Sequence, residues 1–232
     1  MPDVQAPDCL IAWQEGARKL QKGGGEVFNL ITTIDVPTSY QLGWLSTFSP
    51  HAVVAGSDRL LDVINTVFPV RLSKKSASRP VLYDSYDRLH KRAMKLPRNR
   101  SRWGTYFSRL TAYGGKTNQL ETVIQKLKKW PRYTAALVFH LSCPLLDKPR
   151  TRGGPCWHYG ELIWRKGDVL DLVVVYRNHD FFNKALGNFI ALGQLLNFIA
   201  SASGKKSGKL ICHSVHAYSQ QSIKHLVALA QI

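Results

Sequence analysis

The segment FFNKALGNFIALGQLLNFIASAS, residues 181–203, constrains the fold of this chain more than any other stretch. Its apolar residues fall on most sides of a helix instead of one stripe, so other elements have to cover that helix all round. The preceding segment LDLVVVY, residues 170–176, is almost continuously apolar, which is typical of a strand buried on both faces. Together the two segments predict a central helix packed against a sheet.

Helical and strand patterns alternate on both sides of this pair. Apolar periodicity and capping residues predict helices over 9–21, from Ser57 to Val67, over 118–130 with Asn118 as its cap, and over 220–232. Alternating and β-branched stretches predict strands over 27–36 and 133–142, a hairpin over 158–177 that turns at 165–168, and a strand over 209–219. We therefore expect an α+β fold, in which residues 1–232 form one domain with a mixed β-sheet packed against the long buried helix.

The segment 70–105 is polar, basic and interrupted by Pro and Ser, and it predicts a loop-rich insertion with one short helix near 84–94. The whole chain has 32 Lys and Arg against 15 Asp and Glu, a net charge of +17, and many of the cations lie between Lys74 and Arg109. Tyr83, Tyr86 and Trp103 are interleaved with them. Such a segment suits a phosphate group or a nucleic-acid strand, although a generally basic surface would show the same charge.

Neither a membrane segment nor a metal site is expected. No apolar run is as long as the roughly 18–20 residues that span a bilayer, and the N-terminus lacks a secretory signal, so we expect a cytoplasmic location. None of the four cysteines forms a C-x-x-C pair. The closest candidate for a zinc site combines Cys212, His213 and His216 with Cys156 and His158. A strand with one buried and one exposed face explains this pattern better than a metal site does.

Polar residues that a core would not select occur in three segments. Cys156 follows a Gly-Gly-Pro turn, YRNHD at 176–180 ends the apolar strand, and HSVHAY occupies 213–218. Asn188 adds an amide inside the predicted buried helix. Burying an unpaired amide costs about 1–3 kcal/mol, so Asn188 needs a partner, either a neighbouring backbone group or a ligand.

The order and spacing of these residues resemble the thymidylate synthase family. The family pattern is matched by Pro155-Cys156, Arg177-Asn178-His179-Asp180, Asn188 and His216-Ala217-Tyr218. Cys156 lies 21 residues before Arg177 (177 − 156), and Asp180 lies 8 before Asn188 (188 − 180), both near the family spacing. TYFSRL, residues 105–110, resembles the family's Tyr-Gly-x-Arg-Leu segment, and YRNHDFFNKALGNFIALGQL is similar to the short archaeal branch. The resemblance covers roughly residues 103–218, about half of the chain.

The resemblance implies a thymidylate synthase-like fold and a homodimeric enzyme that methylates or hydroxymethylates C5 of a pyrimidine nucleotide such as dUMP, with 5,10-methylenetetrahydrofolate as one-carbon donor. A Cys156 thiolate would add to C6 of the ring, and a nearby Arg177 would lower the pKa of that thiol. By resemblance the catalytic residues are Cys156, Tyr106 and Asp180. The substrate-binding residues are Arg177, Asn188, His216, Tyr218, Arg109 and Arg132.

The chain also departs from the family pattern. The family's paired phosphate-binding arginines fall on Thr134 and Ala135, with only Arg132 nearby, and Trp157 replaces the polar residue after the cysteine. A proton-relaying glutamate is not placed, with Asp84 and Asp87 as weak substitutes, and 14 residues (232 − 218) follow Tyr218. The alternative reading is therefore a catalytically diverged relative that binds nucleic acid or nucleotide through the basic segment 74–109.

Overall fold

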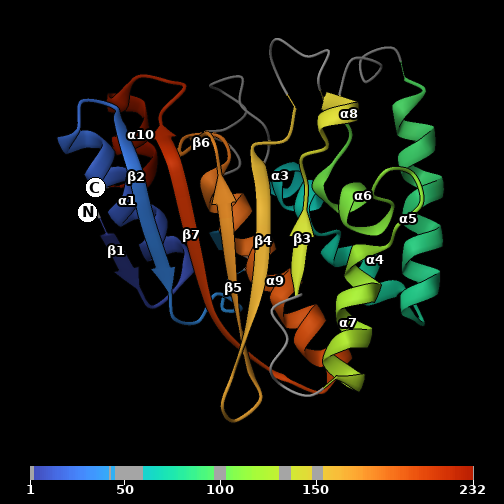
Figure 1. The fold of residues 1–232 in the computed structure, drawn as a ribbon. Helices are drawn as coiled ribbons and strands as arrows, with labels where there is room; N and C mark the ends of the chain where they lie inside the picture. Colours follow the sequence, from blue (N-terminus) through green and yellow to red (C-terminus); the bar gives the residue numbers. More distant parts are fainter. Residues whose placement is uncertain are drawn as a thin grey trace.

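A mixed β-sheet forms the centre of the protein, in a computed structural model that describes residues 3–41, 43–44, 60–96, 103–130, 137–147 and 154–231. The strand order is β1-β2-β7-β5-β4-β3, with β6 paired to β7 (Figure 1). The strands are β1 (Asp3–Ala6), β2 (Glu26–Ile34), β3 (Val138–His140), β4 (Trp157–Arg165), β5 (Val169–Tyr176), β6 (His179–Asp180) and β7 (Lys206–Tyr218). Because β5 runs parallel to β7 and antiparallel to β4, the predicted mixed sheet and α+β class are confirmed.

Helix α9 (Ala185–Ser203) is the predicted central helix, and it lies behind the sheet in Figure 1. By length and composition alone α9 could cross a membrane, but most of it is buried inside the protein. Two glycines allow neighbouring segments to approach closely. A Cβ on Gly187 would lie 2.7 Å from Val63 Cγ1, and a Cβ on Gly193 would lie 1.8 Å from the carbonyl oxygen of Pro37.

The remaining helices mostly follow the predicted pattern. They are α1 (Cys9–Lys22), α3 (Leu60–Val67), α4 (Val70–Lys75), α5 (Arg79–Met94), α6 (Tyr106–Thr111), α7 (Gln119–Lys129), α8 (Pro144–Asp147) and α10 (Ile223–Ala230). Asn118 caps α7 as predicted, because its side chain accepts from the Glu121 N–H at 2.8 Å. The predicted cap Ser57 and the first half of the predicted strand 133–142 lie outside the described residues.

The predicted short helix near 84–94 is present as part of α5. The loop predicted for residues 70–83 is wrong, because α4 and the first part of α5 occupy most of that stretch. Helix α5 buries only Leu82, so its apolar periodicity is too weak to identify its full length from sequence. Its start is nevertheless well specified. The Ser78 side chain accepts from the Val81 N–H, and Pro80 occupies the first turn, where its missing N–H costs nothing.

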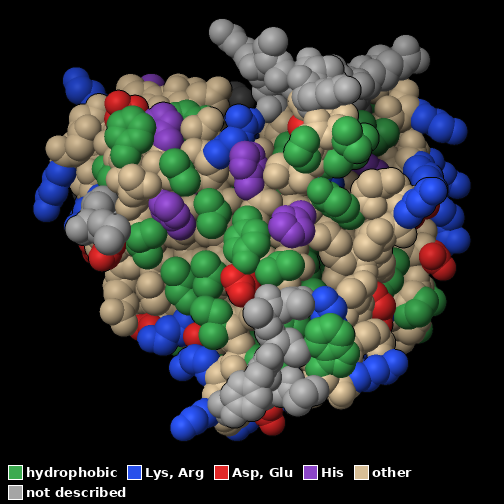
Figure 2. All heavy atoms as spheres, in the orientation of Figure 1, with side chains coloured by type: hydrophobic (Ala, Val, Ile, Leu, Met, Phe, Trp, Pro, Cys, Tyr) green, Lys and Arg blue, Asp and Glu red, His purple; other side chains and the backbone are tan. Residues whose placement is uncertain are grey.

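One face of the sheet is free of the described helices. Helices α1 and α9 pack on the other face, and Figure 2 shows hydrophobic side chains and histidines gathered over the front of the strands. Cross-strand neighbours build this surface, which we call the open face: Ile31, Tyr159, Val173, Val175, Ile211 and His213. All six are half-buried.

Polar segments converge where several elements end. The C-terminal ends of the parallel strands β5 and β7 lie at one edge of the sheet, next to the start of β4 (Figure 1). Residues 177–184 connect β5 to the N-terminus of α9 at the same edge. This edge therefore gathers the segments that the sequence singled out.

Candidate active site

A cavity of about 360 Å³ opens at this edge of the sheet. Five predicted site residues line it: Tyr106, Cys156, Asp180, Asn188 and Tyr218. They come from α6, the turn before β4, strand β6, helix α9 and strand β7. Further lining residues are Trp103, Tyr176, Asn178, His179 and Lys184. The fold thus brings residues from five separate segments to one enclosed space.

The backbone around Cys156 is held from two sides. The Tyr106 hydroxyl accepts from the N–H groups of Cys156 at 3.1 Å and Trp157 at 3.2 Å. On the other side, Arg177 Nε donates to the carbonyl of Pro155 at 3.2 Å, and the Arg177 N–H donates to the Cys156 carbonyl at 2.9 Å. These bonds fix the turn, and the half-buried Cys156 thiol faces the cavity from it.

The thiol of Cys156 experiences opposing electrostatic effects. Burial raises its pKa and is the largest effect, while the guanidinium of Arg177, which hydrogen-bonds the thiol, lowers it. The carboxylate of Asp180 raises it further. The resting residue is therefore a thiol with a cation beside it, and a thiolate formed there is stabilised by Arg177.

Asp180 ties the start of α9 to the end of β7. Its Oδ1 accepts from the N–H groups of Phe182 at 3.0 Å and Gln220 at 3.2 Å, and its Oδ2 accepts from the Asn183 side chain. Burial raises the pKa of the Asp180 carboxyl, and these hydrogen bonds oppose that shift. Asp180 thus shapes the cavity wall and also presents a carboxylate to it.

The buried amide of Asn188 has a partner within the protein. Its Nδ2 lies 3.2 Å from His179 Nε2, and the opposite ring nitrogen, His179 Nδ1, lies 2.8 Å from the Ser214 hydroxyl. The imidazole is completely buried and stacks on Tyr176 with ring centroids 4.3 Å apart. Burial lowers the pKa of His179 to about 3, so the ring is neutral at physiological pH.

Tyr176 and Lys184 complete the polar lining. The buried Tyr176 hydroxyl has no hydrogen-bond partner among the described residues, and burial raises its pKa well above the ordinary value. Lys184 precedes Asn188 by one helical turn, and burial lowers the pKa of its ammonium to about 8. A buried hydroxyl without a partner normally costs free energy, so a ligand that hydrogen-bonds to Tyr176 would recover it.

No family model matches the chain. The chain is 30% identical over 114 residues to a protein of Methanosarcina barkeri named "Putative thymidylate synthase". It is 31% identical over 116 residues to a protein of the same name from Methanococcoides burtonii. These matches support a divergent thymidylate synthase-like family for the part of the chain that they cover. Each match covers 49% of this chain and 51% of the relative. The chain therefore spans about half the length of the curated relatives it matches.

Three predicted site residues among the described ones are not part of the cavity lining: Arg177, His216 and Arg109. Arg177 lies next to the cavity, bonded to the backbone of Pro155 and Cys156. His216 lies beside the cavity, stacked on Tyr218 at 5.2 Å and hydrogen-bonded to Asn178 and Glu26. Arg109 is held in a two-point ion pair with Asp147, at 2.7 and 2.8 Å, and it lines a separate, smaller cavity. Arg132 lies outside the described residues.

Trp157, which departs from the family pattern, faces away from the cavity. Its side chain is fully buried, and its indole N–H donates to the carbonyl of Tyr159 at 2.7 Å. It packs near Tyr106 and Tyr176, with ring centroids 5.5 and 6.4 Å away. Trp157 therefore supports two residues of the cavity wall from behind.

The sequence patterns singled out the segment 176–180 but assigned no site role to Tyr176 or His179, and they did not single out Lys184; all three line the cavity. A signal for each exists in hindsight. Tyr176 ends a buried strand and His179 lies just after it, and Lys184 lies four residues before Asn188, on the same side of the helix. Among the described residues no group of His, Cys, Asp and Glu could hold a metal ion.

Proposed function

We propose that this chain catalyses one-carbon transfer, methylation or hydroxymethylation, to C5 of a pyrimidine nucleotide such as dUMP. The observation that carries the proposal is the cavity that Cys156 shares with Asn188, Asp180 and Tyr218. A partly exposed thiol beside a guanidinium is a nucleophile, and the surrounding amide, carboxylate and hydroxyl groups suit a polar heterocycle. The names of the relatives point to the same substrate class.

The chemistry assigns a clear role to Cys156. Its thiolate donates an electron pair to C6 of the pyrimidine, and the C5–C6 π electrons move toward C5 and O4, so C5 becomes nucleophilic. After C5 has gained its substituent, loss of the C5 proton and expulsion of the thiolate restore the ring. Arg177 stabilises the thiolate and can pair with a phosphate through its planar guanidinium.

The remaining groups of the cavity suit binding and orientation. Asn188 offers a carbonyl and an amino group to the base edge, and Tyr218, backed by His216, offers its hydroxyl to the sugar. Tyr176 supplies a hydroxyl that lacks a partner in the described structure. In this proposal Tyr106 acts by holding the backbone of Cys156 and Trp157 in place.

The described residues also fit a folate. Asp180 presents a buried carboxylate to the cavity, and such an acceptor matches the N–H groups of a pterin, while Trp103 adds an aromatic face to the same wall. When bound, 5,10-methylenetetrahydrofolate would supply the one-carbon unit and, for a methyl product, also the hydride that reduces it; for a hydroxymethyl product, water would supply the oxygen. Asp180 and Trp103 would hold it next to the nucleotide.

The test is release of tritium from C5 of dUMP, UMP, dCMP and CMP in the presence of methylenetetrahydrofolate. We expect release from at least one nucleotide, and its loss in Cys156→Ser. Cys143→Ser is the matched control, because Cys143 lines the separate cavity next to Arg109. Folded protein that releases no tritium from any of the four nucleotides would refute the proposal.

We also propose that two copies associate through the open face. A sheet face of branched apolar residues is ordinarily covered by a second layer, and self-association of the same surface gives a closed dimer. Light scattering on the wild type should give the mass of a dimer, and Ile211→Glu, at the centre of the open face, should give a monomer. A monomeric wild type at micromolar concentration would contradict this.

One core cluster joins residues from Val4 to Ala230, which supports the proposal of one domain over 1–232. The four cysteines are free thiols, which supports the proposal of a cytoplasmic location.

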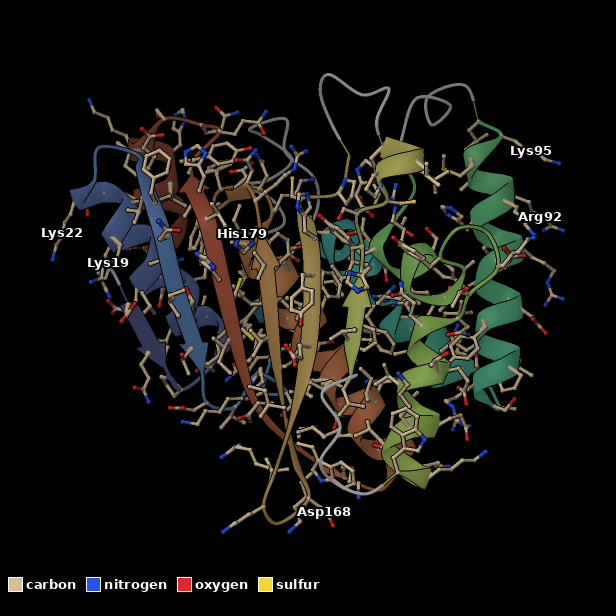
Figure 3. The ribbon with its side chains drawn as sticks, viewed as in Figure 1. Lys19, Lys22, Arg92, Lys95, Asp168 and His179 are labelled. Atoms are coloured by element: carbon tan, nitrogen blue, oxygen red, sulfur yellow. The ribbon has the colours of Figure 1, made fainter. Side chains whose placement is uncertain are left out.

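Helix α5 favours a second candidate function, binding of nucleic acid. Arg88, Lys91, Arg92 and Lys95 are exposed on it, and Figure 3 shows Arg92 and Lys95 pointing away from the protein. Lys91 pairs with Asp87 at 2.6 Å, so the helix is not purely basic. Binding to single-stranded DNA should weaken steeply with salt and survive Cys156→Ser. No binding at about 50 mM salt would exclude this candidate.

A further inference from the structure

A chain of three hydrogen-bonded side chains ends at the cavity. Ser214 Oγ lies 2.8 Å from His179 Nδ1, and His179 Nε2 lies 3.2 Å from Asn188 Nδ2. Ser214 and His179 are fully inaccessible to solvent, and Asn188 is 3% exposed. His179 lies at the upper ends of β5 and β7 in Figure 3, directly in front of α9. Of these three residues, His179 and Asn188 line the cavity and Ser214 does not.

Within this series of hydrogen bonds, the role of each group as donor or acceptor follows from that of its neighbour. The Asn188 amino group can only donate, so His179 Nε2 has to accept and carries no proton. A neutral imidazole then has its proton on Nδ1, which donates it to the Ser214 hydroxyl. A half-turn of the ring would put carbon atoms in the places of both nitrogens and break both hydrogen bonds, and the stacking of Tyr176 on one face at 4.3 Å further holds the ring in place. Each bond therefore sets the direction of the next.

We propose that His179 is a positioning residue that fixes the amide orientation of Asn188 and so decides whether the cavity accepts a uracil or a cytosine base. The inference rests on the proposed function of the cavity and deepens it. An amide presents a carbonyl oxygen and an amino group side by side, and the order of the two is what a base reads.

The two bases require opposite orders. Uracil offers an N3–H donor and an O4 acceptor, whereas cytosine offers an N3 acceptor and a 4-amino donor. A side-chain amide that is free to rotate by half a turn pairs with either base. With Nδ2 held by His179, Asn188 keeps one order, and the base with the other pattern leaves buried polar groups unpaired. Loss of a buried pairing of this kind lowers affinity by about tenfold to a hundredfold.

The test is calorimetric binding of dUMP and dCMP to the wild type, to His179→Phe and to Ser214→Ala. Phenylalanine at position 179 keeps an aromatic ring stacked against Tyr176 but removes the His179 Nε2 acceptor. Ser214→Ala changes no residue of the cavity wall, so an effect on base preference must pass through His179. We expect the wild type to prefer one nucleotide, and both variants to shift the ratio of the two dissociation constants at least about tenfold toward unity.

The outcomes separate the inference from the proposed function. If the wild type binds neither nucleotide, the inference fails, while the proposed function is decided separately by tritium release from the four nucleotides. If the wild type prefers one nucleotide and both variants keep the same ratio, the proposed function stands and the role of His179 is wrong. Equal binding of both nucleotides by the wild type also overturns the role of His179. If His179→Phe does not fold, Ser214→Ala alone decides.

Discussion

Acid should destabilise this protein through His179, and the magnitude follows from the structure. Burial lowers the pKa of His179 to about 3 in the folded protein, whereas an unfolded histidine titrates at about 6.5. As the pH falls below about 6.5 the unfolded chain binds a proton that the folded protein does not, so the free energy of unfolding decreases. The stability that depends on a neutral His179 is thus complete above about pH 6.5 and is lost as the pH falls toward 3.

Each pH unit in this window corresponds to about 1.4 kcal/mol for one group. Between about pH 7 and pH 5 the contribution of His179 therefore falls by about 2 kcal/mol. Other groups titrate as well, so the quantity to measure is the difference between the wild type and His179→Phe. The variant lacks the titrating ring, and its free energy of unfolding should decrease by about 2 kcal/mol less over the same interval.

Urea unfolding followed by circular dichroism at the two pH values measures this difference. His225→Gln is the control for replacing a histidine at the surface, because His225 is exposed on α10. An identical loss of stability in the wild type and in His179→Phe would refute the reasoning, since the buried ring would then titrate as it does in the unfolded chain. If His179→Phe does not fold, the ring can be followed in the wild type by NMR, and protonation near pH 6 would refute it equally.

Three further predictions concern packing, an ion pair and the unpartnered hydroxyl. Gly193→Ala should cost about 1–3 kcal/mol in a urea melt, because the added Cβ would meet the carbonyl oxygen of Pro37 at 1.8 Å; an unchanged midpoint would contradict the close approach. Arg109→Met should cost about 2–4 kcal/mol by removing the guanidinium that neutralises the Asp147 carboxylate, while nucleotide affinity measured by calorimetry stays the same; weaker binding would return Arg109 to the substrate site. Tyr176→Phe should stabilise the ligand-free protein by about 1 kcal/mol and weaken nucleotide binding, and a destabilised variant would indicate a partner for the hydroxyl.

The elements that dominate the core could be predicted from the sequence, and those at its margin could not. The apolar run that became α9 and the hairpin of β4 and β5 carry strong periodic signals, because burial requires them. Helix α5 buries only Leu82, and its stability comes from contacts that have no sequence period, such as the pairing of Arg79 and Tyr83 with Glu121. Strand β1 has four residues, too few for an alternating pattern to stand out.

The site shows a similar division. The resemblance to the thymidylate synthase family indicated Cys156, Asp180, Asn188 and Tyr218, and the fold brings all four to one cavity. What Asn188 contacts could not be predicted, because the chain gives no sign that His179 folds back toward it and carries a hydrogen bond on to Ser214.

Alkylation of the cysteines tests most directly whether the cavity beside Cys156 is a nucleotide site. Cys156 is half-buried, whereas Cys9 and Cys212 are fully buried and serve as internal controls. Peptide mass spectrometry after brief exposure of the folded protein to iodoacetamide should find Cys156 modified and the two controls unmodified. Saturating dUMP, UMP, dCMP or CMP should slow the modification of Cys156 for at least one of the four. Modification of Cys156 at an unchanged rate with all four nucleotides would contradict the account.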